Sequence, residues 1–395
     1  MSQFAAALDR SAVERMLVRY VGIHSVNPAI DGGPGESLFA TAVHDDLVDM
    51  GFSVIRDPIT AGGRDNIVAR LDGHPDGPVV MYHAHLDTVG FSGKAFAEPT
   101  VADGMVYGRG SCDTKGSVVA MVQALGLLQQ VPADQRATVV FVGGIDEEVG
   151  GTGARSLTDR FPDIEMAVIG EPTSLELTTA HKGVLRFEIA TIGSPAHSSR
   201  PALGKNAINA MTAVLDALDN EYRPGLDDVT HALVGHPTIN VSTIAGGSSL
   251  NVVPAECVIA LDRRVVPGED HDALLAEFDE LLAGVDARGC TIERRPAFLA
   301  TAPLDTPVDH PVVAALQASK AALTGDGGQP VGVTFGSDAS WFSPAGVDCV
   351  VFGPGSIDQA HSDLEWVPIE EVALAGEILA QTALELAAAQ LSGTS

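Results

Sequence analysis

The sequence predicts an α/β protein in which a mostly parallel sheet is flanked by helices, with a ferredoxin-like domain inserted into the chain. With 395 residues the chain is too long for one small core, so two domains are expected. Short apolar runs alternate with helical stretches in the first and last parts, which is typical of a sheet covered on both faces. The middle part instead has the order β-α-β-β-α-β of a ferredoxin-like unit.

The first part opens with two amphipathic helices, expected at 11–22 and 36–50, where Leu, Val and Met recur at helical spacing. A third helix is expected at 116–130. Around it lie four short apolar runs that predict buried strands, at 66–71, 78–82, 137–142 and 166–169. In such sheets, active sites gather at the carboxyl ends of the strands.

The pattern changes near Ala180, where a half-exposed strand begins. The main domain resumes near Pro303, so we expect a first part at 1–180, an inserted domain at 181–298 and a second part at 299–395. Elements of the insert are expected at 184–192, 206–218, 238–244, 252–265, 270–282 and 291–295, and elements of the last part at 310–324, 349–352 and 369–391.

Charge and composition limit the kinds of molecule that the protein is expected to bind. The formal net charge is −29, from 52 acidic and 23 basic residues, which argues against nucleic acid and anionic membranes. Solubility is a simpler reason for this charge than substrate steering. No apolar run has the length of a membrane span and no secretory leader is visible, so a cytoplasmic protein is expected. The four cysteines form no CxxC pair, which predicts neither a disulfide framework nor a cysteine zinc site.

The first candidate site follows the strand that starts at Pro78. His85 could bind zinc through a neutral imidazole. Asp87, two residues on, faces the same side of an extended chain and could hold the other ring nitrogen. Such a pair alone is more often structural, but its position at a strand end favours a functional role.

Two more carboxylate sites lie in glycine-rich segments. Asp113 stands in 107–116, at the start of a helix, where an ordinary N-cap is the alternative interpretation. The run Asp146-Glu147-Glu148 follows another apolar strand, where a solvated turn is the alternative. Adjacent glutamates can divide their roles, one binding metal and the other serving as a general base.

The last two sites are Glu171, at the end of a strand, and His361, in a glycine-rich loop after a strand, although a lone histidine there could be a surface residue. Two histidines and three carboxylates together suit two zinc ions about 3.5–4 Å apart that share one carboxylate. The sequence contains neither a GxxxxGK[ST] phosphate loop nor a GxSxG nucleophile elbow.

The motifs HAHLDTV, GRGSCDTKG, DEEVGGTGA, IGEP and GPGSIDQAH, in this order, resemble the zinc aminoacylase family. This family includes acetylornithine deacetylases, succinyl-diaminopimelate desuccinylases, aminoacylases and glutamate carboxypeptidases, and the resemblance covers essentially the whole chain. It implies two zinc ions per subunit, which cobalt could replace. One would be held by His85, Asp113 and Glu171, and the other by Asp113, Glu148 and His361.

The resemblance also implies roles around the ligands. Asp87 would orient His85, and Glu147 would be the general base. The peptide bond after Asp113 would be cis, as is common in the family. His197 of the inserted lid and dimerisation domain would reach the active site of the partner subunit of a homodimer. Substrate contacts would come from Arg264 as a carboxylate clamp, from Asn251 and from the loop containing Ser337.

The substrate expected from the resemblance is a small N-acyl amino acid. The segments EPTSL, HKG and GPGSIDQAH look most like those of an acetylornithine deacetylase, whereas residues 335–339 resemble a desuccinylase loop. N-acetylornithine is therefore expected, with desuccinylase or dipeptidase activity as an alternative. A catalytically silent scaffold is the alternative from another class, and the complete set of ligands together with Glu147 argues against it.

Overall fold

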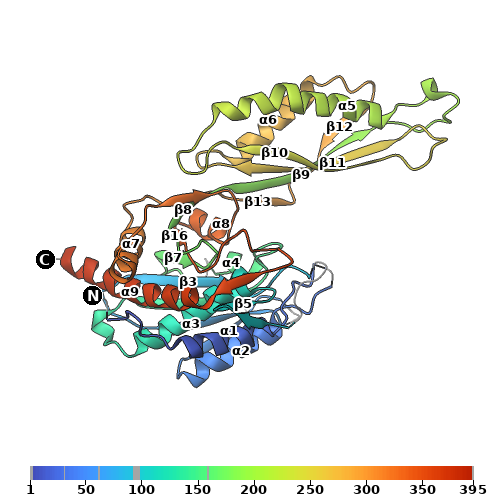
Figure 1. Ribbon diagram of the computed structural model, residues 1–395. Coiled ribbons are helices and arrows are strands. Elements are labelled where there is room, and N and C mark those ends of the chain that lie inside the picture. The colour runs from blue at the N-terminus through green and yellow to red at the C-terminus, as the bar shows by residue number, and fades with distance from the viewer. Residues whose placement is uncertain (1–2, 31, 61–62, 92–97, 158–159, 394–395) are drawn as a thin grey trace. The chain divides into compact units, whose positions relative to one another are not determined.

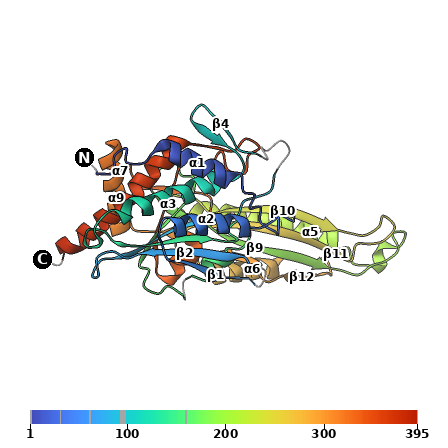
Figure 2. The ribbon, with the colours of Figure 1, turned by 90° about the horizontal axis from the view of Figure 1, so that it is seen from below.

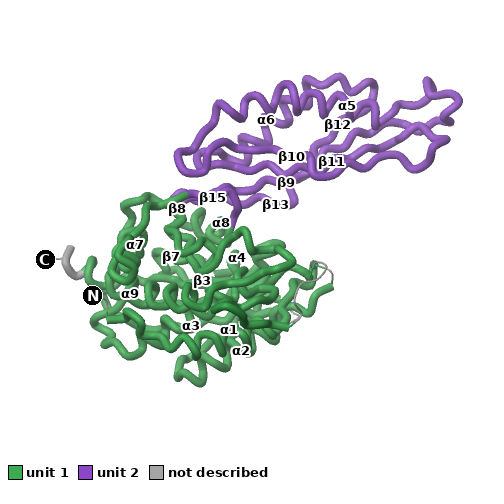
Figure 3. Tube along the Cα trace, in the orientation of Figure 1, with its two compact units in different colours: residues 1–179, 306–331, 337–395 green, residues 180–305, 332–336 purple. Residues whose placement is uncertain are grey.

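The computed structural model of the chain describes residues 3–30, 32–60, 63–91, 98–157 and 160–393. The chain divides into two compact units, coloured separately in Figure 3. Unit 1 contains Met1–Thr179, Thr306–Val331 and Ser337–Ser395, and unit 2 contains Ala180–Asp305 and Gly332–Gly336. The second boundary lies later than the expected 298/299, because the strand β13 (Leu299–Thr301) pairs with a strand of unit 2.

The sheet of unit 1 has four parallel strands at its centre, in the order β6-β3-β7-β16. Antiparallel strands β2 and β1 extend it on the β6 side, and β8 follows β16. The bounds are β1 (Val54–Pro58), β2 (Asp65–Leu71), β3 (Val79–His85), β6 (Thr138–Gly144), β7 (Met166–Ile169), β8 (Thr178–His181) and β16 (Asp348–Val351). The chain passes between the units at β8, after β14 (Leu304–Asp305), within β15 (Val331–Val333) and after Gly336.

Helices cover both faces of this sheet, which confirms the predicted α/β class. Figure 1 shows α1, α2, α3 and α9 on one face and the short α4 and α8 on the other, and Figure 2 shows the first group from below. The helix α7 packs against α9. The bounds are α1 (Arg10–Val21), α2 (Ser37–Asp49), α3 (Gly116–Gln129), α4 (Thr152–Arg155), α7 (Pro311–Thr324), α8 (Ala339–Phe342) and α9 (Ile369–Gly393).

Successive side chains of β3 point alternately to the two faces of the sheet. Tyr82 faces α9, where its hydroxyl donates a hydrogen bond of 2.7 Å to the carbonyl oxygen of Leu379. His83 points to the opposite face and stacks edge-on against Phe342 of α8, with ring centroids 5.1 Å apart. His85 shares the side of His83, because side chains alternate along a strand.

The helix α9 corrects one expectation from the sequence. Residues Ile369–Gln390 are long and apolar enough to cross a membrane by length and composition, and 67% of the most apolar stretch is buried inside the protein. Buried side chains of α9 such as Val372, Ile378 and Leu379 belong to the hydrophobic core of unit 1. This burial accounts for the apolar composition of α9 as that of a core helix.

Unit 2 has the predicted order of elements, β9-α5-β10-β11-α6-β12, and its strands pair antiparallel in the order β10-β11-β9-β12. The helices α5 and α6 pack on the sheet through one apolar core. Pro254 interrupts the strand expected at 252–265, so β11 begins at Glu256. The bounds are β9 (Gly183–Ile192), α5 (Ala207–Ala217), β10 (Thr238–Gly246), β11 (Glu256–Val265), α6 (His271–Gly284) and β12 (Thr291–Arg294).

A small antiparallel sheet joins two segments of unit 1 that are far apart in the sequence. The strand β17 (Trp366–Pro368) pairs with β5 (Met105–Tyr107), which pairs with β4 (Thr100–Ala102). The segment that follows His361 is therefore held beside the segment that precedes Asp113.

Candidate metal centre

The candidate ligands all lie in unit 1, beyond the carboxyl ends of its four parallel strands. His85 ends β3, and Glu148 follows β6. Glu171 follows β7, and His361 lies in the loop after β16. Asp113 stands in the turn before α3. Because neighbouring parallel strands end at one edge of the sheet, segments from five parts of the chain converge there.

Asp113 lies between the two histidines. Its Oδ1 is 2.9 Å from Nε2 of His85, and its Oδ2 is 3.3 Å from Nε2 of His361. The same nitrogen of His361 is 3.1 Å from Oε2 of Glu148. Ligand atoms of His85, Asp113 and Glu148 lie within 4.8 Å of one another. The two oxygens of one carboxylate thus face two separate groups of donors.

The turn Ser111–Lys115 gives Asp113 this position. The helix α3 begins at Gly116 after the N-cap Lys115, and no side chain caps it. Asp113 has φ −117° and ψ 90°, outside the helical range. The N-cap interpretation of Asp113 is therefore wrong, because its carboxylate contacts histidines and not the helix. The Asp113-Thr114 peptide bond is cis, as the resemblance implies.

The buried carboxylates of the centre carry an electrostatic cost. Burial, together with the neighbouring carboxylates, raises the pKa of Glu147 and of Glu171 well above the ordinary value, and burial and Asp113 raise the pKa of Glu148. Asp113 and Glu148 raise the pKa of His361 to about 10. A divalent cation would favour the ionised carboxylates, so oxygen and imidazole donors gathered in this way fit a metal site.

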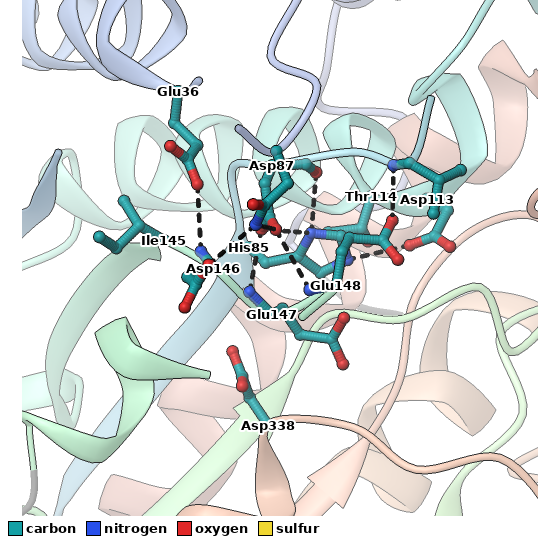
Figure 4. A network of polar contacts seen from close by, with 12 residues as sticks. Glu36, His85, Asp87, Asp113, Thr114, Ile145, Asp146, Glu147, Glu148 and Asp338 are labelled. Carbon is teal, nitrogen blue, oxygen red and sulfur yellow. Dashed lines mark hydrogen bonds and ion pairs between the residues drawn. The ribbon is translucent and has the colours of Figure 1, made fainter. Parts of the chain in front are cut away.

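Asp87 has a larger role than the sequence suggests (Figure 4). Nδ1 of His85 lies 3.0 Å from the main-chain oxygen of Asp87 and 3.5 Å from its carboxylate Oδ1. The carboxylate accepts hydrogen bonds from the backbone N–H groups of Glu147 and Glu148, at 3.0 and 3.1 Å. Asn27 donates a further bond of 2.7 Å. Asp87 therefore holds the turn that carries the candidate base.

Asn27 belongs to the same network, and no sequence signal marks it, whereas Asp146 is the first carboxylate of the acidic run after β6. The side-chain amide of Asn27 also donates to Oδ1 of Asp146, at 2.9 Å. Asp146 has a left-handed backbone, with φ 69°, and accepts a further bond of 3.1 Å from Arg64. Nothing in the sequence around Asn27 distinguishes it from a loop asparagine, because its partners are 60 and 119 residues away.

The loop containing Ser337 lies next to Glu147, the candidate base. Ser337 is buried, with 5% of its surface exposed. The neighbouring Asp338 forms a buried pair with His83, whose Nε2 is 2.7 Å from Oδ2 of Asp338. Figure 4 shows Glu147 between Asp338 and the pair His85–Asp113. The carboxylate of Asp338 is one of the charges that raise the pKa of Glu147.

The remaining candidates, His197, Asn251 and Arg264, belong to unit 2. The structure brings the first two together: His197 pairs with Val252 in a short bridge, and the N–H of Ser198 donates to the carbonyl oxygen of Asn251 at 2.9 Å. His197 and Asn251 are exposed. Arg264 lies on β11 and its Nε donates to Asp262 at 2.8 Å, so part of its charge is already paired.

Comparison with known proteins adds a family match. The model of peptidase family M20/M25/M40 matches residues 81–385. An acetylornithine deacetylase of Proteus mirabilis (strain HI4320) is 32% identical over 362 residues, which cover 85% of this chain and 86% of the relative. The solved structure of aminopeptidase PepT from Bacillus cereus has a TM-score of 0.79 at 19% identity and covers 96% of this chain and 99% of its own. A dinuclear metal-binding peptidase of Bacillus subtilis has a TM-score of 0.73 at 16% identity, with coverages of 95% and 97%. The two solved structures share the fold of this chain.

Proposed function

Because this chain belongs to peptidase family M20/M25/M40, and is therefore a metal-dependent hydrolase of amide bonds, we propose N-acetylornithine as its substrate and two zinc ions as its cofactor. The substrate is that of the deacetylase relative, which covers most of both chains. The reaction adds water across the amide bond and yields acetate and the free amine of ornithine.

One observation carries the proposal of two ions. The two carboxylate oxygens of Asp113 face different histidines, His85 at 2.9 Å and His361 at 3.3 Å. Glu148 lies beside His361, and Glu171 is close enough to His85 to raise its pKa. This arrangement supports one ion on each side of a shared Asp113, with Glu171 on the His85 side and Glu148 on the His361 side.

Ions held by these residues would supply Lewis acidity, which would polarise the amide carbonyl and lower the pKa of water. Glu147 takes a proton from the attacking water and delivers it to the leaving nitrogen as the carbon–nitrogen bond breaks. Asp87 keeps Glu147 in place through the backbone of its turn. The strong proton affinity that burial gives Glu147 suits a general base.

For unit 2 we propose a lid that forms a homodimer in the cytoplasm and supplies substrate contacts. Among the described residues the strand β10 pairs in its sheet only with β11, so it is an edge strand, and Ile244 on it is 57% exposed. An apolar exposed edge is suited to pairing with another chain. In the dimer, His197 would stabilise the oxyanion in the active site of the partner subunit, and Arg264 and Asn251 would bind the substrate carboxylate.

The test is a substrate panel with the purified protein, loaded separately with Zn²⁺ and Co²⁺. The panel holds N-acetylornithine, N-succinyl-diaminopimelate, N-acetyl derivatives of other amino acids and a dipeptide, and free amine is measured. We expect metal-dependent release of ornithine that chelation abolishes. Preferred hydrolysis of the succinyl compound or of the dipeptide would replace the proposed substrate, and no hydrolysis with two ions bound would favour the silent scaffold.

A further inference from the structure

The carboxylate of Glu365 sits between the segments that carry two of the proposed ligands. Only 2% of Glu365 is exposed. Its oxygens accept hydrogen bonds from the backbone N–H groups of Gly110, Cys112 and Asp113, each at 2.9 Å. One side chain therefore holds the first part of the turn that presents Asp113, although it lies about 250 residues later in the sequence.

The guanidinium of Arg109 extends this contact to two further segments. Its Nη1 donates to Glu365 at 2.7 Å. Its Nη2 donates to the carbonyl oxygen of Ser362, next to His361, at 3.1 Å, and its Nε donates to that of Gly90, beyond the His85 segment, also at 3.1 Å. Arg109 is 6% exposed. A planar group with donors in fixed directions is suited to holding three acceptors at once.

We propose that Arg109 and Glu365 form a positioning pair that holds the His85, Asp113 and His361 segments in the geometry of the metal centre before an ion binds. The proposal rests on the proposed metal centre, to which it adds two residues outside the set of proposed ligands. Residues that orient ligands from outside the centre affect metal affinity because they reduce the reorganisation that binding requires.

His361 has the greatest need of such support. Its side chain is 56% exposed, and its backbone has φ 58°, an uncommon conformation for a residue other than glycine. Packing around an exposed side chain restrains it little. The hydrogen bond from Arg109 to Ser362 and the attachment of the chain at Glu365 restrain the loop on the side that follows His361.

A purely structural role is the competing explanation, and the chain offers a matched pair to separate the two. Glu377 is 1% exposed and accepts hydrogen bonds from Arg10, at 2.5 Å, and from the N–H of Leu8, at 3.1 Å. This pair joins α9 to the start of α1 and involves no ligand segment. Loss of either pair removes a buried carboxylate with several donors, but only loss of the first should alter the metal centre.

The experiment compares Glu365→Gln, Arg109→Met and Arg109→Lys with Glu377→Gln. For each metal-free protein, the stoichiometry and the Kd of each Zn²⁺ ion are measured by competition with a chromogenic chelator. We expect Glu365→Gln to raise both Kd values about 10- to 100-fold, because Asp113 serves both ions. Arg109→Met should mainly weaken the ion on the His361 side, Arg109→Lys should recover part of that loss, and Glu377→Gln should lower Tm with both Kd values unchanged.

Hydrogen exchange in the metal-free proteins tests the pair without any ion. We expect the amides of Gly110, Cys112 and Asp113 to exchange faster in Glu365→Gln than in the wild type, with no such change in Glu377→Gln. Two ions bound with wild-type affinity in Glu365→Gln and Arg109→Met would overturn the proposal. If Glu365→Gln does not fold, Arg109→Lys and Arg109→Met decide by the same Kd values. Failure of the wild type to bind two ions would contradict the proposed function. The hydrogen-exchange rates would still show whether Arg109 and Glu365 hold the Asp113 turn.

Discussion

At the scale of single residues, the two adjacent glutamates after β6 have different surroundings. Glu148 lies 3.1 Å from His361, among the proposed ligands. The charges that act most strongly on Glu147 come from His85 and from the carboxylates of Glu171, Asp338 and Glu148, and burial raises its pKa. This environment favours a proton acceptor at Glu147 and a metal ligand at Glu148, which is the division of roles expected from the sequence.

We predict that Glu147→Ala lowers kcat by about two to four orders of magnitude, the contribution of a positioned general base, and leaves the metal content unchanged. Steady-state kinetics and elemental analysis of the same preparation measure both quantities. The exposed Glu176→Gln variant serves as the control and should keep both values. Loss of one ion from Glu147→Ala would make this residue a ligand and reverse the assignment.

A second prediction concerns Asp87. The Asp87→Asn variant keeps one oxygen but places an amide where the N–H groups of Glu147 and Glu148 now donate to a carboxylate. We expect kcat per bound ion to fall about 10- to 100-fold, a range typical of groups that support a metal centre from outside. Elemental analysis and kcat are again measured together. If Asp87 served only His85, the variant would lose metal while each remaining loaded site kept its wild-type kcat.

At the scale of elements, the parallel strands determine where the ligands converge. The four strands β6, β3, β7 and β16 end at the same edge, and the segment after each carries a candidate residue, which for β16 is His361 in a longer loop. The strands are buried and mostly apolar, apart from the histidines at the carboxyl end of β3. The candidate residues thereby lie at the strand ends and in the turns that follow, while the strands supply a rigid support.

The strand β8 contains a buried histidine, His181. Because its pKa is shifted, we predict that the stability of the protein depends on pH. Burial lowers the pKa of His181 to about 4, from an ordinary value of 6.5. Between these values the unfolded chain binds a proton that the folded chain does not, so stability is full above pH 6.5 and is lost as the pH falls towards 4. The loss from this group is on the order of 3 kcal/mol.

Urea unfolding of the wild type and of His181→Gln at pH 7 and at pH 4.5 measures this effect. We expect the acid-induced loss of stability to be smaller in the variant, because glutamine does not titrate. Parallel pH profiles for wild type and His181→Gln would show that burial of this imidazole does not contribute.

At the scale of the whole molecule, the two units carry different candidate site residues. The proposed ligands and base lie in unit 1, whereas His197, Asn251 and Arg264 lie in unit 2. In the proposed homodimer, unit 2 of one subunit contributes residues to the active site in unit 1 of its partner. The net charge of −29 gives each chain a strongly acidic surface, so we expect association of two chains to be favoured by salt, which screens their repulsion.

Mixed dimers test whether the active site is shared. We predict that His197→Ala subunits mixed with Glu147→Ala subunits regain activity, because one site of each hybrid has both residues. With free exchange of an equal mixture, about a quarter of all sites are complete. Activity of the mixture is compared with that of each variant alone, and subunit exchange is verified with two affinity tags. Absence of recovery in a mixture that exchanges would place His197 outside the partner's site.

Most of the fold follows from the sequence because its signals are local. Apolar runs and helical spacing predict β7 and α3 to within a residue, and the order of elements predicts the ferredoxin-like unit. The exceptions have local causes as well: Pro254 delays the start of β11, and β13 shifts the second boundary of the units by pairing with β9. The sequence singles out the candidate ligands because each follows a strand or stands in a glycine-rich turn, and their role as ligands stays a prediction.

The contacts that support the ligands were decided by the tertiary structure alone. Asn27 reaches Asp87 and Asp146 across 60 and 119 residues, and Glu365 reaches the Asp113 turn across 252. Neither residue lies in a periodic pattern or a motif, because a hydrogen-bonding side chain leaves no local signal of where its partner lies. The sequence by itself thus determined the elements and the ligand candidates. Only folding, which aligns the strand ends, determined that Asp113 faces both histidines and which residues hold it there.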